Sequence, residues 1–235
     1  KGKADAARGK IFTKLGRELL IAVKEGGPDP AGNSKLKGVI AKCKAANMPN
    51  DTINNAIKKA STSNENYEEI TYEGYGAGGV AVVVETMTDN RNRTAGDVRS
   101  LFSKFGGNLG ETNCVSYMFD KKGSITFDSE GIDFEKLFEA AINLDAEDVE
   151  EDEDTYRVIT SVETFQSVVE GLEKEGFKSS NAELTRIPKN TIEITDVKTA
   201  TSVMRLIERL EELDDVQNVY ANCDISDEIA QQADV

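Results

Sequence analysis

The spacing of apolar residues changes at about residue 60, and this change limits the folds that the chain can adopt. Before it, apolar side chains recur every three or four residues, as at Leu36, Val39 and Cys43, which is the spacing of one face of an α-helix. Glycine and proline at positions 26–32, and Pro49, interrupt this pattern. We therefore expect a small bundle of three helices, over about residues 3–24, 34–46 and 51–60.

A small polar linker over residues 61–69 leads into a region in which strands and helices alternate. Runs of β-branched and aromatic residues predict a strand over 80–87 and two more near 114–119 and 124–127, the last two joined by a turn at 120–123. Helical spacing ended by two glycines predicts a helix over 94–105, and a second helix and strand are expected over 197–213 and 216–221. Together these elements predict a ferredoxin-like unit.

A second set of elements lies between the two parts of that unit. It comprises an expected helix over 134–144, strands over 146–150 and 155–160, a helix over 162–175 and a strand over 179–187. Residues 191–195 either complete this second sheet or lead back to the first.

The predicted fold class is therefore α+β, with an N-terminal three-helix bundle and two ferredoxin-like α/β domains, one inserted in the other. The predicted domains are a basic helical domain over 1–65, a ferredoxin-like domain formed by 70–130 and 196–228, and an inserted α/β domain over 131–195. A length of 235 residues is sufficient for three domains.

Composition matters because the charge is unevenly distributed. The whole chain has a formal net charge of −15, which by itself predicts repulsion from nucleic acid. Residues 1–60, however, carry 13 basic and 5 acidic residues, a net charge of +8, whereas the other 175 residues have a net charge of −23. A basic head on an acidic body indicates that the basic part contacts nucleic acid.

Cations of the first helix gather on one of its sides. At about 100° per residue, an arc of roughly 80° opposite the apolar side chains contains Lys3, Lys10, Lys14, Arg17 and Lys24. Arg8 instead projects on the apolar side, where its stem can lie along apolar surface. In the second helix, lysines flank the buried stripe. The expected nucleic-acid contacts are Lys3, Arg8, Lys10, Lys14, Arg17, Lys24, Lys35, Lys37, Lys42 and Lys44.

Two more candidate contacts, Arg91 and Arg93, lie in the sequence DNRNRT at a strand-to-helix junction. Arginine binds phosphate as a planar bidentate donor, and the free N–H groups at a helix N-terminus also favour anions. In the alternative interpretation, Asp89 and the asparagines cap the turn and the arginines pair with carboxylates. The sequence leaves both interpretations open.

Two other sequence patterns resemble known binding motifs but lack features that those motifs require. Residues 74–79 form a GxGxxG sequence, but a strand follows it, whereas a dinucleotide-binding loop opens a helix; a glycine-rich entry to a strand is expected, without a cofactor. The acidic run over 145–154 lacks the glycine and the later glutamate of an EF-hand loop. It predicts a solvated hairpin and no metal site.

The composition also argues against several classes of protein. The chain has no histidine, so Ser-His-Asp triads, Cys-His dyads and His-bound metals are absent from it, and we predict no enzyme and no small-molecule substrate. Cys43, Cys114 and Cys223 are too far apart for a CxxC pair, which favours a reducing, cytoplasmic compartment. No apolar run approaches the roughly 18 residues that a membrane helix needs.

Six blocks of the sequence together resemble the YebC/PmpR family. They are KADAARGKIFTKLGR at 3–17, YEGYGAGG at 72–79, DNRNRT at 89–94, FSKFGGNLG at 102–110, DDVQNVYAN at 214–222 and ISDE at 225–228. The resemblance implies a helical head with two ferredoxin-like domains. It also implies a probable DNA-binding transcriptional regulator, although a mitochondrial relative activates translation of a cytochrome oxidase subunit and some bacterial members are linked to ribosomes stalled on proline-rich sequence.

The sequence departs from that family at its start. The family normally begins with a short basic segment that contains a His-Ser-Lys-Trp motif, whereas this chain begins at Lys1 and has neither His nor Trp. We therefore expect this copy to lack a short N-terminal segment, which weakens the argument from missing histidine.

Three functions follow as hypotheses. The first is a transcriptional regulator whose basic head holds the phosphates of duplex DNA. The second is a translation factor that binds ribosomal RNA on the ribosome with the same face, because A-form RNA is recognised largely by its shape and phosphates. The third, which the resemblance disfavours, is an acidic interaction module whose lysine head binds proteins.

Overall fold

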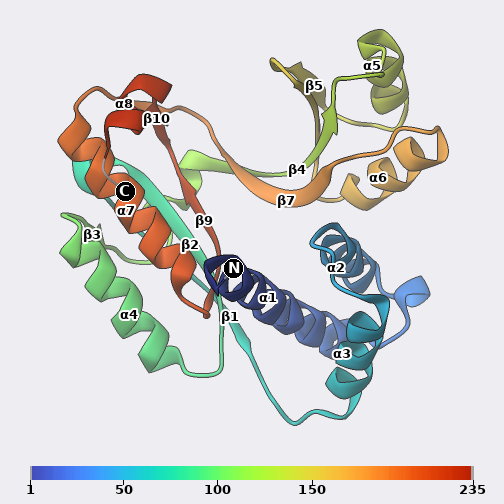
Figure 1. Ribbon diagram of the computed structural model, residues 1–235, viewed down its shortest axis with the longest axis horizontal. Helices are drawn as coiled ribbons and strands as arrows, with labels where there is room; N and C mark the ends of the chain where they lie inside the picture. The colour runs from blue at the N-terminus through green and yellow to red at the C-terminus, as the bar shows by residue number, and fades with distance from the viewer. Residues whose placement is uncertain (1, 234–235) are drawn as a thin grey trace. The chain divides into compact units, whose positions relative to one another are not determined.

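The computed structural model describes residues 2–233, which form two compact units (Figure 1). The first unit contains the described residues up to Glu18, then Ser63–Asp120 and the chain from Pro188 onward. The second contains Leu19–Thr62 and Lys121–Ile187. Helices form the start of the chain and mixed helices and strands follow, so the predicted α+β class is confirmed.

The three predicted N-terminal helices are confirmed as α1 (Gly2–Gly26), α2 (Ser34–Ala45) and α3 (Asn50–Thr62). Asn33 ends the break between the first two, which also contains the short 3-10 helix η1 (Pro30–Gly32). The Asn33 side chain accepts a hydrogen bond from the Leu36 N–H at 3.1 Å and donates to the Ala22 carbonyl at 2.8 Å. Because Asn33 is buried, this amide both caps α2 and ties it to the end of α1.

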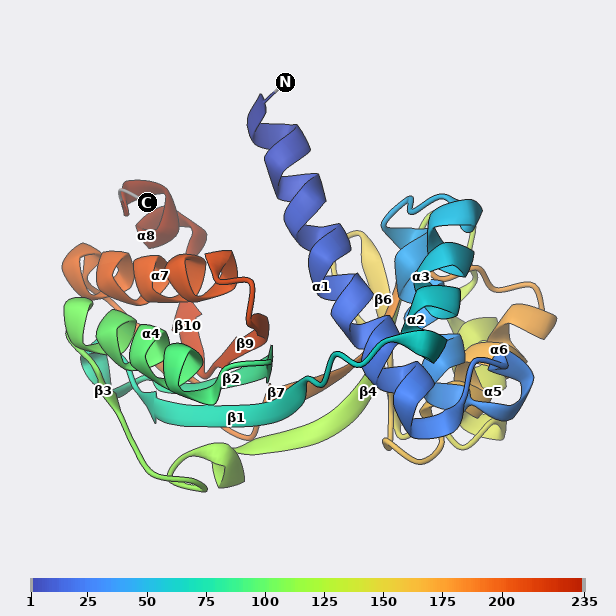
Figure 2. The same cartoon turned by 90° about the horizontal axis from the view of Figure 1, so that it is seen from below.

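The first unit is built on a four-stranded antiparallel sheet in the order β3-β1-β2-β9. Its strands are β1 (Glu68–Tyr75), β2 (Ala81–Thr88), β3 (Asn108–Leu109) and β9 (Val216–Ala221). Two helices, α4 (Arg91–Lys104) and α7 (Val197–Glu212), lie on one face of this sheet (Figure 2). The predicted strands over 80–87 and 216–221 and both predicted helices are thus present.

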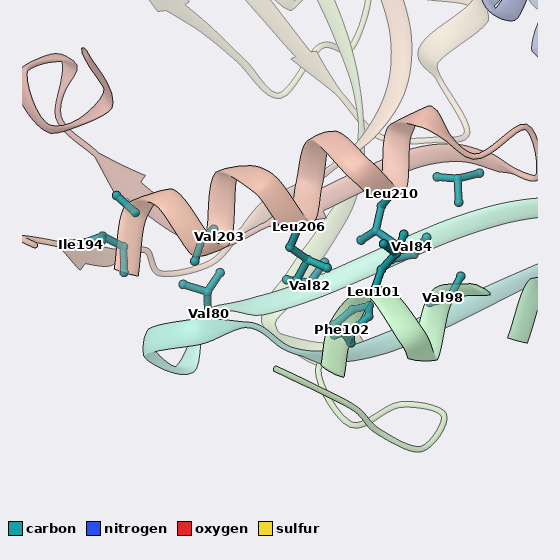
Figure 3. Packing of buried hydrophobic residues seen from close by; sticks show 12 residues of the cluster. Val80, Val82, Val84, Val98, Leu101, Phe102, Ile194, Val203, Leu206 and Leu210 are labelled. Carbon is teal, nitrogen blue, oxygen red and sulfur yellow. The ribbon is translucent and has the colours of Figure 1, made fainter. Parts of the chain in front are cut away.

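The core of this unit lies between the sheet and those helices (Figure 3). Val82 of β2, Phe102 of α4 and Leu206 of α7 are all fully buried in it. The opposite face of β2 is buried too, since Ala81 and Val83 pack with residues of the 115–119 segment. Burial of both faces explains why the β2 sequence is continuously apolar instead of alternating.

A small second sheet in the first unit decides the place of residues 191–195. Strand β8 (Ile192–Ile194) pairs in parallel with β10 (Cys223–Ile225), which the short helix α8 (Asp227–Gln232) follows. Of the two possibilities that the sequence left open, the chain takes the one that leads back to the first unit.

The second unit contains a four-stranded sheet in the order β5-β6-β4-β7. Its strands are β4 (Phe119–Asp128), β5 (Asp148–Glu151), β6 (Thr155–Thr160) and β7 (Asn181–Pro188). With helices α5 (Phe134–Asn143) and α6 (Phe165–Lys174), the chain runs β-α-β-β-α-β, which is the ferredoxin-like arrangement. The predicted acidic hairpin is confirmed, because β5 and β6 flank residues 152–154 and pair in antiparallel fashion.

The expected strand over 114–119 and the expected turn at 120–123 are wrong, whereas the expected strand over 124–127 is confirmed as part of β4. Residues 116–118 form a 3-10 helix, η3 (Ser116–Met118), and β4 runs unbroken through the expected turn at 120–123. Gly123 lies in the ladder opposite Thr160, and a Cβ atom there would come within 2.5 Å of the Phe165 ring. The glycine therefore marks a close approach of side chains and not a turn.

As a result, the strands that make up each sheet differ from the prediction. Strand β4 pairs with β6, so it is the first strand of the second sheet and not the last of the first. Residues 68–75, which were expected to belong to a linker and to a glycine-rich entry to a strand, form β1 of the first sheet. The domain ranges 1–65, 70–130 with 196–228, and 131–195 stay a prediction.

The glycine-rich stretch after β1 leads into a strand, as predicted. Gly78 and Gly79 have φ angles of 73° and 76° inside the short η2 turn (Ala77–Gly79), a conformation that favours glycine. Gly74 lies where a Cβ atom would come within 2.4 Å of the Asn108 carbonyl oxygen of β3. These glycines shape the β1–β2 connection and allow β3 to approach.

Candidate nucleic-acid interface

Two lysines of the predicted basic face lie against the C-terminal end of α7. The Lys10 ammonium donates to the Glu212 carbonyl oxygen at 2.7 Å, and Lys14 donates to the Glu211 carbonyl oxygen. The last carbonyl groups of a helix lack partners within the helix and carry partial negative charge, which favours cations there. Burial lowers the pKa of Lys14, which is half-buried at this contact, whereas Lys10 is exposed.

The third cation of that face, Arg17, reaches a buried carboxylate. Its guanidinium donates to Asp215 at 2.8 Å and to the Met87 carbonyl oxygen at 3.0 Å. The same guanidinium stacks over the Tyr67 ring, 4.9 Å from its centroid. The Arg17 and Asp215 side chains are only 14% and 7% exposed, so this ion pair lies within the packed part of the first unit.

Asp215 also receives the DNRNRT segment. Arg93 donates to both carboxylate oxygens of Asp215, at 3.1 and 2.8 Å, and to Asp89 at 2.7 Å. The hydroxyl of Thr94, which is fully buried, donates at 2.7 Å to Asp215 Oδ2, the oxygen that Arg93 contacts at 3.1 Å. Asp215 with Arg17, Arg93 and Thr94 is called the Asp215 cluster below.

Hydrogen bonds within the Asp215 cluster shift the pKa values of Asp215 and Arg93 toward their charged forms. Burial by itself raises the pKa of Asp215, but hydrogen bonds from Arg93, Arg17 and Thr94 outweigh it and leave that pKa below its ordinary value. Hydrogen bonds to Asp215 and Asp89 raise the pKa of Arg93 in turn. The cluster therefore holds the charged Asp215 carboxylate between Arg17, an expected phosphate contact, and Arg93, for which the sequence left both interpretations open.

Arg91, the other arginine of this segment, points elsewhere. It donates to Glu68 at 2.7 Å, and both side chains are exposed, at 66% and 57%. That hydrogen bond raises the pKa of Arg91. Asn90 caps α4 by accepting from the Arg93 N–H. In the structure an asparagine caps the turn and both arginines pair with carboxylates, and contact of Arg91 and Arg93 with phosphate stays a prediction.

The remaining basic residues of α1 are exposed. Lys3 and Arg8 lie on its first turns, and the Arg8 guanidinium stacks over the neighbouring Phe12 ring, 5.3 Å from its centroid. Lys24 lies exposed in the last turn of α1, within the second unit.

The lysines of α2 divide between ion pairs and open surface. Lys35 pairs with Glu25 at 2.9 Å and Lys37 with Glu170 of α6 at 2.5 Å. Lys42 is half-buried, and Lys44 is exposed in the last turn of the helix.

The structure thus brings four predicted residues together and leaves the others apart. Lys10, Lys14, Arg17 and Arg93 converge on the end of α7 and the residues directly after it. Asp215, which organises them, was missed, although it stands in the quoted block DDVQNVYAN. A single buried carboxylate produces no periodic pattern in the sequence. The only indication that Asp215 is buried was its position directly before the apolar start of β9.

In residues 2–233, a metal site would need a cluster of metal-ligating side chains, and a membrane span would need an apolar helix of membrane length. Within that range no three acidic or cysteine side chains gather in a way that could hold a metal ion. None of the helices there is both long and apolar enough to cross a bilayer.

The fold and the charge pattern define an α+β protein with a basic helical N-terminal region. Carboxylates of the same chain pair with some of its basic residues. Residues 1–63 match the family described as the TACO1/YebC protein N-terminal domain. Residues 67–223 match the TACO1/YebC second and third domain. The chain belongs to the TACO1/YebC family, which confirms the resemblance found in the sequence.

Relatives in this family carry regulatory names. A "probable transcriptional regulatory protein" of Acetivibrio thermocellus is 57% identical over 94% of this chain and 93% of its own length. One of Geobacter sulfurreducens, with the same description, is 56% identical over 97% of this chain and 92% of its own. A crystal structure of a conserved hypothetical protein from Aquifex aeolicus matches with a TM-score of 0.86 and 47% identity, covering 97% of this chain and 94% of that one.

Proposed function

We propose that this protein is a DNA-binding regulator of transcription that holds phosphates with its basic N-terminal helices. The observation that carries the proposal is the separation of charge: residues 1–60 have a net charge of +8, and Lys3, Arg8, Lys10, Lys24 and Lys44 there are exposed. The names of the relatives support a regulatory role. Contacts of lysine with phosphate give affinity and a steep dependence on salt, with little reading of sequence.

The Asp215 cluster divides the predicted contacts into two roles. Lys10 bonds a carbonyl oxygen near the surface, and an exposed contact of this kind has a small net free energy, so a phosphate can replace the carbonyl. Arg17 and Arg93 share a buried carboxylate instead. In this proposal they position α1 and the start of α4, and the exposed cations make the phosphate contacts.

A second candidate is a translation factor that binds ribosomal RNA with the same residues. The predominance of lysine favours it as much as DNA, because an ammonium group is a point charge that suits the phosphates of either polymer. The two candidates differ in their target and not in their contact chemistry.

The test compares two charge reversals of equal size. The first variant carries Lys3→Glu, Arg8→Glu and Lys10→Glu on the exposed turns of α1, and the matched control carries Lys121→Glu, Lys136→Glu and Lys198→Glu at exposed positions elsewhere. Binding to duplex DNA is measured by fluorescence anisotropy and binding to ribosomes by co-sedimentation, both at near-physiological salt.

We expect the α1 variant to lose at least tenfold in affinity and the control less than threefold. Loss of DNA binding with unchanged ribosome binding supports the first candidate, and the reverse supports the second. Equal effects of the two variants, or binding that barely responds to salt, would refute phosphate contact by the basic head.

A further inference from the structure

A groove of about 410 Å³ lies in the second unit between the C-terminal half of α2 and the edge of the second sheet. It is lined by residues of α2, β4 and α6 and by the chain that enters β7: Ala41, Lys42, Lys44 and Ala45; Ile125 and Phe127; Val169 and Glu173; and 177–182. Its volume falls in the range of small-molecule and nucleotide sites.

The floor of the groove is apolar and aromatic. Ile125 and Phe127 belong to the core of the second unit, and Phe177 packs against that core after the end of α6. The Phe127 and Phe177 rings meet edge to face, with centroids 6.5 Å apart and planes at 79°. The Phe177 ring is half-buried, and an aromatic ring that is partly open to a groove can stack with a flat ligand.

The rim of the groove is cationic. Lys44 from α2 and Lys178 from the segment before β7 are exposed, and Lys42 is half-buried. Glu173 is the one carboxylate among the residues that line it. Three lysines against one glutamate are notable in a chain with a net charge of −15, and they favour an anionic ligand.

Polar groups that can read a ligand lie at the sheet edge. Ser179, Ser180 and Asn181 line the groove directly before and at the start of β7, which is the edge strand. Both the N–H and the hydroxyl of Ser180 donate to the Thr126 carbonyl oxygen, at 2.8 and 3.2 Å. This segment is therefore anchored to β4, while the Asn181 side chain is exposed at the groove.

The wall formed by α2 is held in place by contacts with α6. Lys37 pairs with Glu170 at 2.5 Å, and a Cβ atom at Gly38 would lie 3.6 Å from the Gln166 side chain. Hydrogen bonds from Lys37 and Gln166 lower the pKa of Glu170, so the carboxylate stays charged at neutral pH. The lysines of α2 are thus presented to the groove from a fixed helix.

We propose that this groove binds a nucleotide with an unstacked base, the base against the Phe177 side and the phosphate at Lys44 and Lys178. An apolar aromatic floor, a cationic rim and amide and hydroxyl groups at one edge are the combination that binds unpaired nucleotides. A base within a duplex is not available to such a groove. The inference rests on the proposed function and adds that one unpaired nucleotide of the bound nucleic acid occupies this site.

The nucleotide can come from a single strand or be free in solution, and the probes separate the two. Fluorescein-labelled rU10, dT10 and a 20-base-pair DNA duplex are titrated with the full chain by fluorescence anisotropy. Uridine monophosphate is titrated separately, with the backbone amide signals of residues 178–182 followed by NMR.

Three variants test the groove. Lys44→Glu with Lys178→Glu reverses its rim, and Lys121→Glu with Lys136→Glu is the matched control at exposed positions of the same unit. Phe177→Leu keeps an apolar side chain but removes the ring. Circular dichroism and the thermal midpoint of each variant establish that it is folded.

We expect the rim reversal to weaken binding of the single strands at least tenfold and the control less than twofold. The slope of log K against log salt should fall by roughly 0.7 for each phosphate contact that is lost. Phe177→Leu should weaken single-strand binding about fivefold to tenfold with an unchanged salt slope, because stacking and not charge is removed. Duplex binding should change less than twofold in Phe177→Leu.

The outcomes separate this inference from the proposed function. If the chain binds nucleic acid but the rim reversal and Phe177→Leu leave single-strand affinity unchanged, the groove is not the site and the basic head alone can hold the polymer. If it binds neither strands nor duplex, both proposals fail. Shifts of the 178–182 signals by uridine monophosphate without binding of rU10 or dT10 would overturn the single-strand source in favour of a free nucleotide.

Discussion

Two groups of basic residues, one in each unit of this protein, lie in opposite settings. In the first, Arg17 and Arg93 converge on Asp215, whose side chain is 7% exposed. In the second, Lys44 and Lys178 are exposed at the rim of a groove with a single carboxylate in its lining. One group of cations neutralises a charge that folding has removed from water, and the other remains available to a ligand.

The comparison shows that the number of basic residues does not reveal what those residues bind. A carboxylate taken out of water must be paired and hydrogen-bonded, so Asp215 commits its cations to the fold. Exposed lysines contribute little to stability and can serve binding. Stability and binding measurements should therefore separate the two groups.

The largest effect is expected for Asp215→Ala. It leaves two guanidinium groups and the Thr94 hydroxyl without their shared acceptor, and breaking a buried ion pair costs about 3–5 kcal/mol of unfolding free energy. Denaturation in guanidinium chloride measures the change. Asp214→Ala, at an exposed neighbour, is the control. An Asp215→Ala protein as stable as the wild type would show that the cluster does not stabilise the fold.

The next effect, for Glu73→Gln, tests a buried carboxylate that has backbone partners in place of arginines. Glu73 is 3% exposed and accepts N–H hydrogen bonds from Asn113, Val115 and Ser116. Burial raises its pKa, but these hydrogen bonds outweigh burial and leave the pKa below the ordinary value of 4.5. Glu73→Gln should lower the unfolding free energy at pH 7 by about 2 kcal/mol.

The pH dependence of that difference follows from the lowered pKa. The charged Glu73 stabilises the fold above its unfolded pKa, and this contribution is lost as pH falls through the lower folded pKa. The gap between wild type and Glu73→Gln should therefore narrow below about pH 4.5. Urea denaturation at pH 7, 5 and below 4 measures it, and a gap that widens in acid would contradict the assignment.

A smaller effect is expected for Thr94→Val within the Asp215 cluster. The substitution keeps the shape of a fully buried side chain but removes a hydrogen bond to a charged acceptor, which costs about 1.5 kcal/mol. Thr94→Ser retains the hydroxyl and serves as the comparison. If the serine and valine variants are equally destabilised, the lost methyl contact and not the hydrogen bond determines the cost.

The smallest effect is expected for Arg91→Ala. The Arg91–Glu68 pair is exposed on both sides, and exposed ion pairs contribute little. The thermal midpoint should match that of the wild type, in Arg91→Ala and in Glu68→Ala alike. A clear fall in the midpoint would mean that the two arginines of DNRNRT are less different than their surroundings indicate.

How much of the fold could be predicted depended on whether the signal was local. Helical spacing located α2 and α7 closely, and β-branched runs located β2, β6 and β9. Strand β1 was missed because Gly74 and several glutamates interrupt it, and the need for that glycine comes from β3, more than thirty residues later. Gly123 was wrongly interpreted as part of a turn for the same reason, because the side chains that require this glycine, Thr160 and Phe165, are distant in the sequence.

The candidate site was predicted in part. The basic head and the DNRNRT segment were found because charge is visible in the sequence, and Arg91 and Arg93 were found with both of their interpretations open. That Arg17 and Arg93 share Asp215 could not be predicted, since Arg17 and Asp215 are separated by 198 positions. The groove lined by Lys44 and Lys178 could not be predicted either, because it joins elements that are not neighbours in the chain.

The helical head, the alternation of strands and helices after it, and the division of charge at residue 60 follow from the residue types within a short window, so they can be predicted from the sequence. The sheet to which β4 belongs, the cations that meet a buried anion and the cations that line a groove become known only from the three-dimensional packing. Those outcomes depend on which distant side chains packing removes from water together, and a carboxylate that loses its water must find its cations wherever the fold brings them.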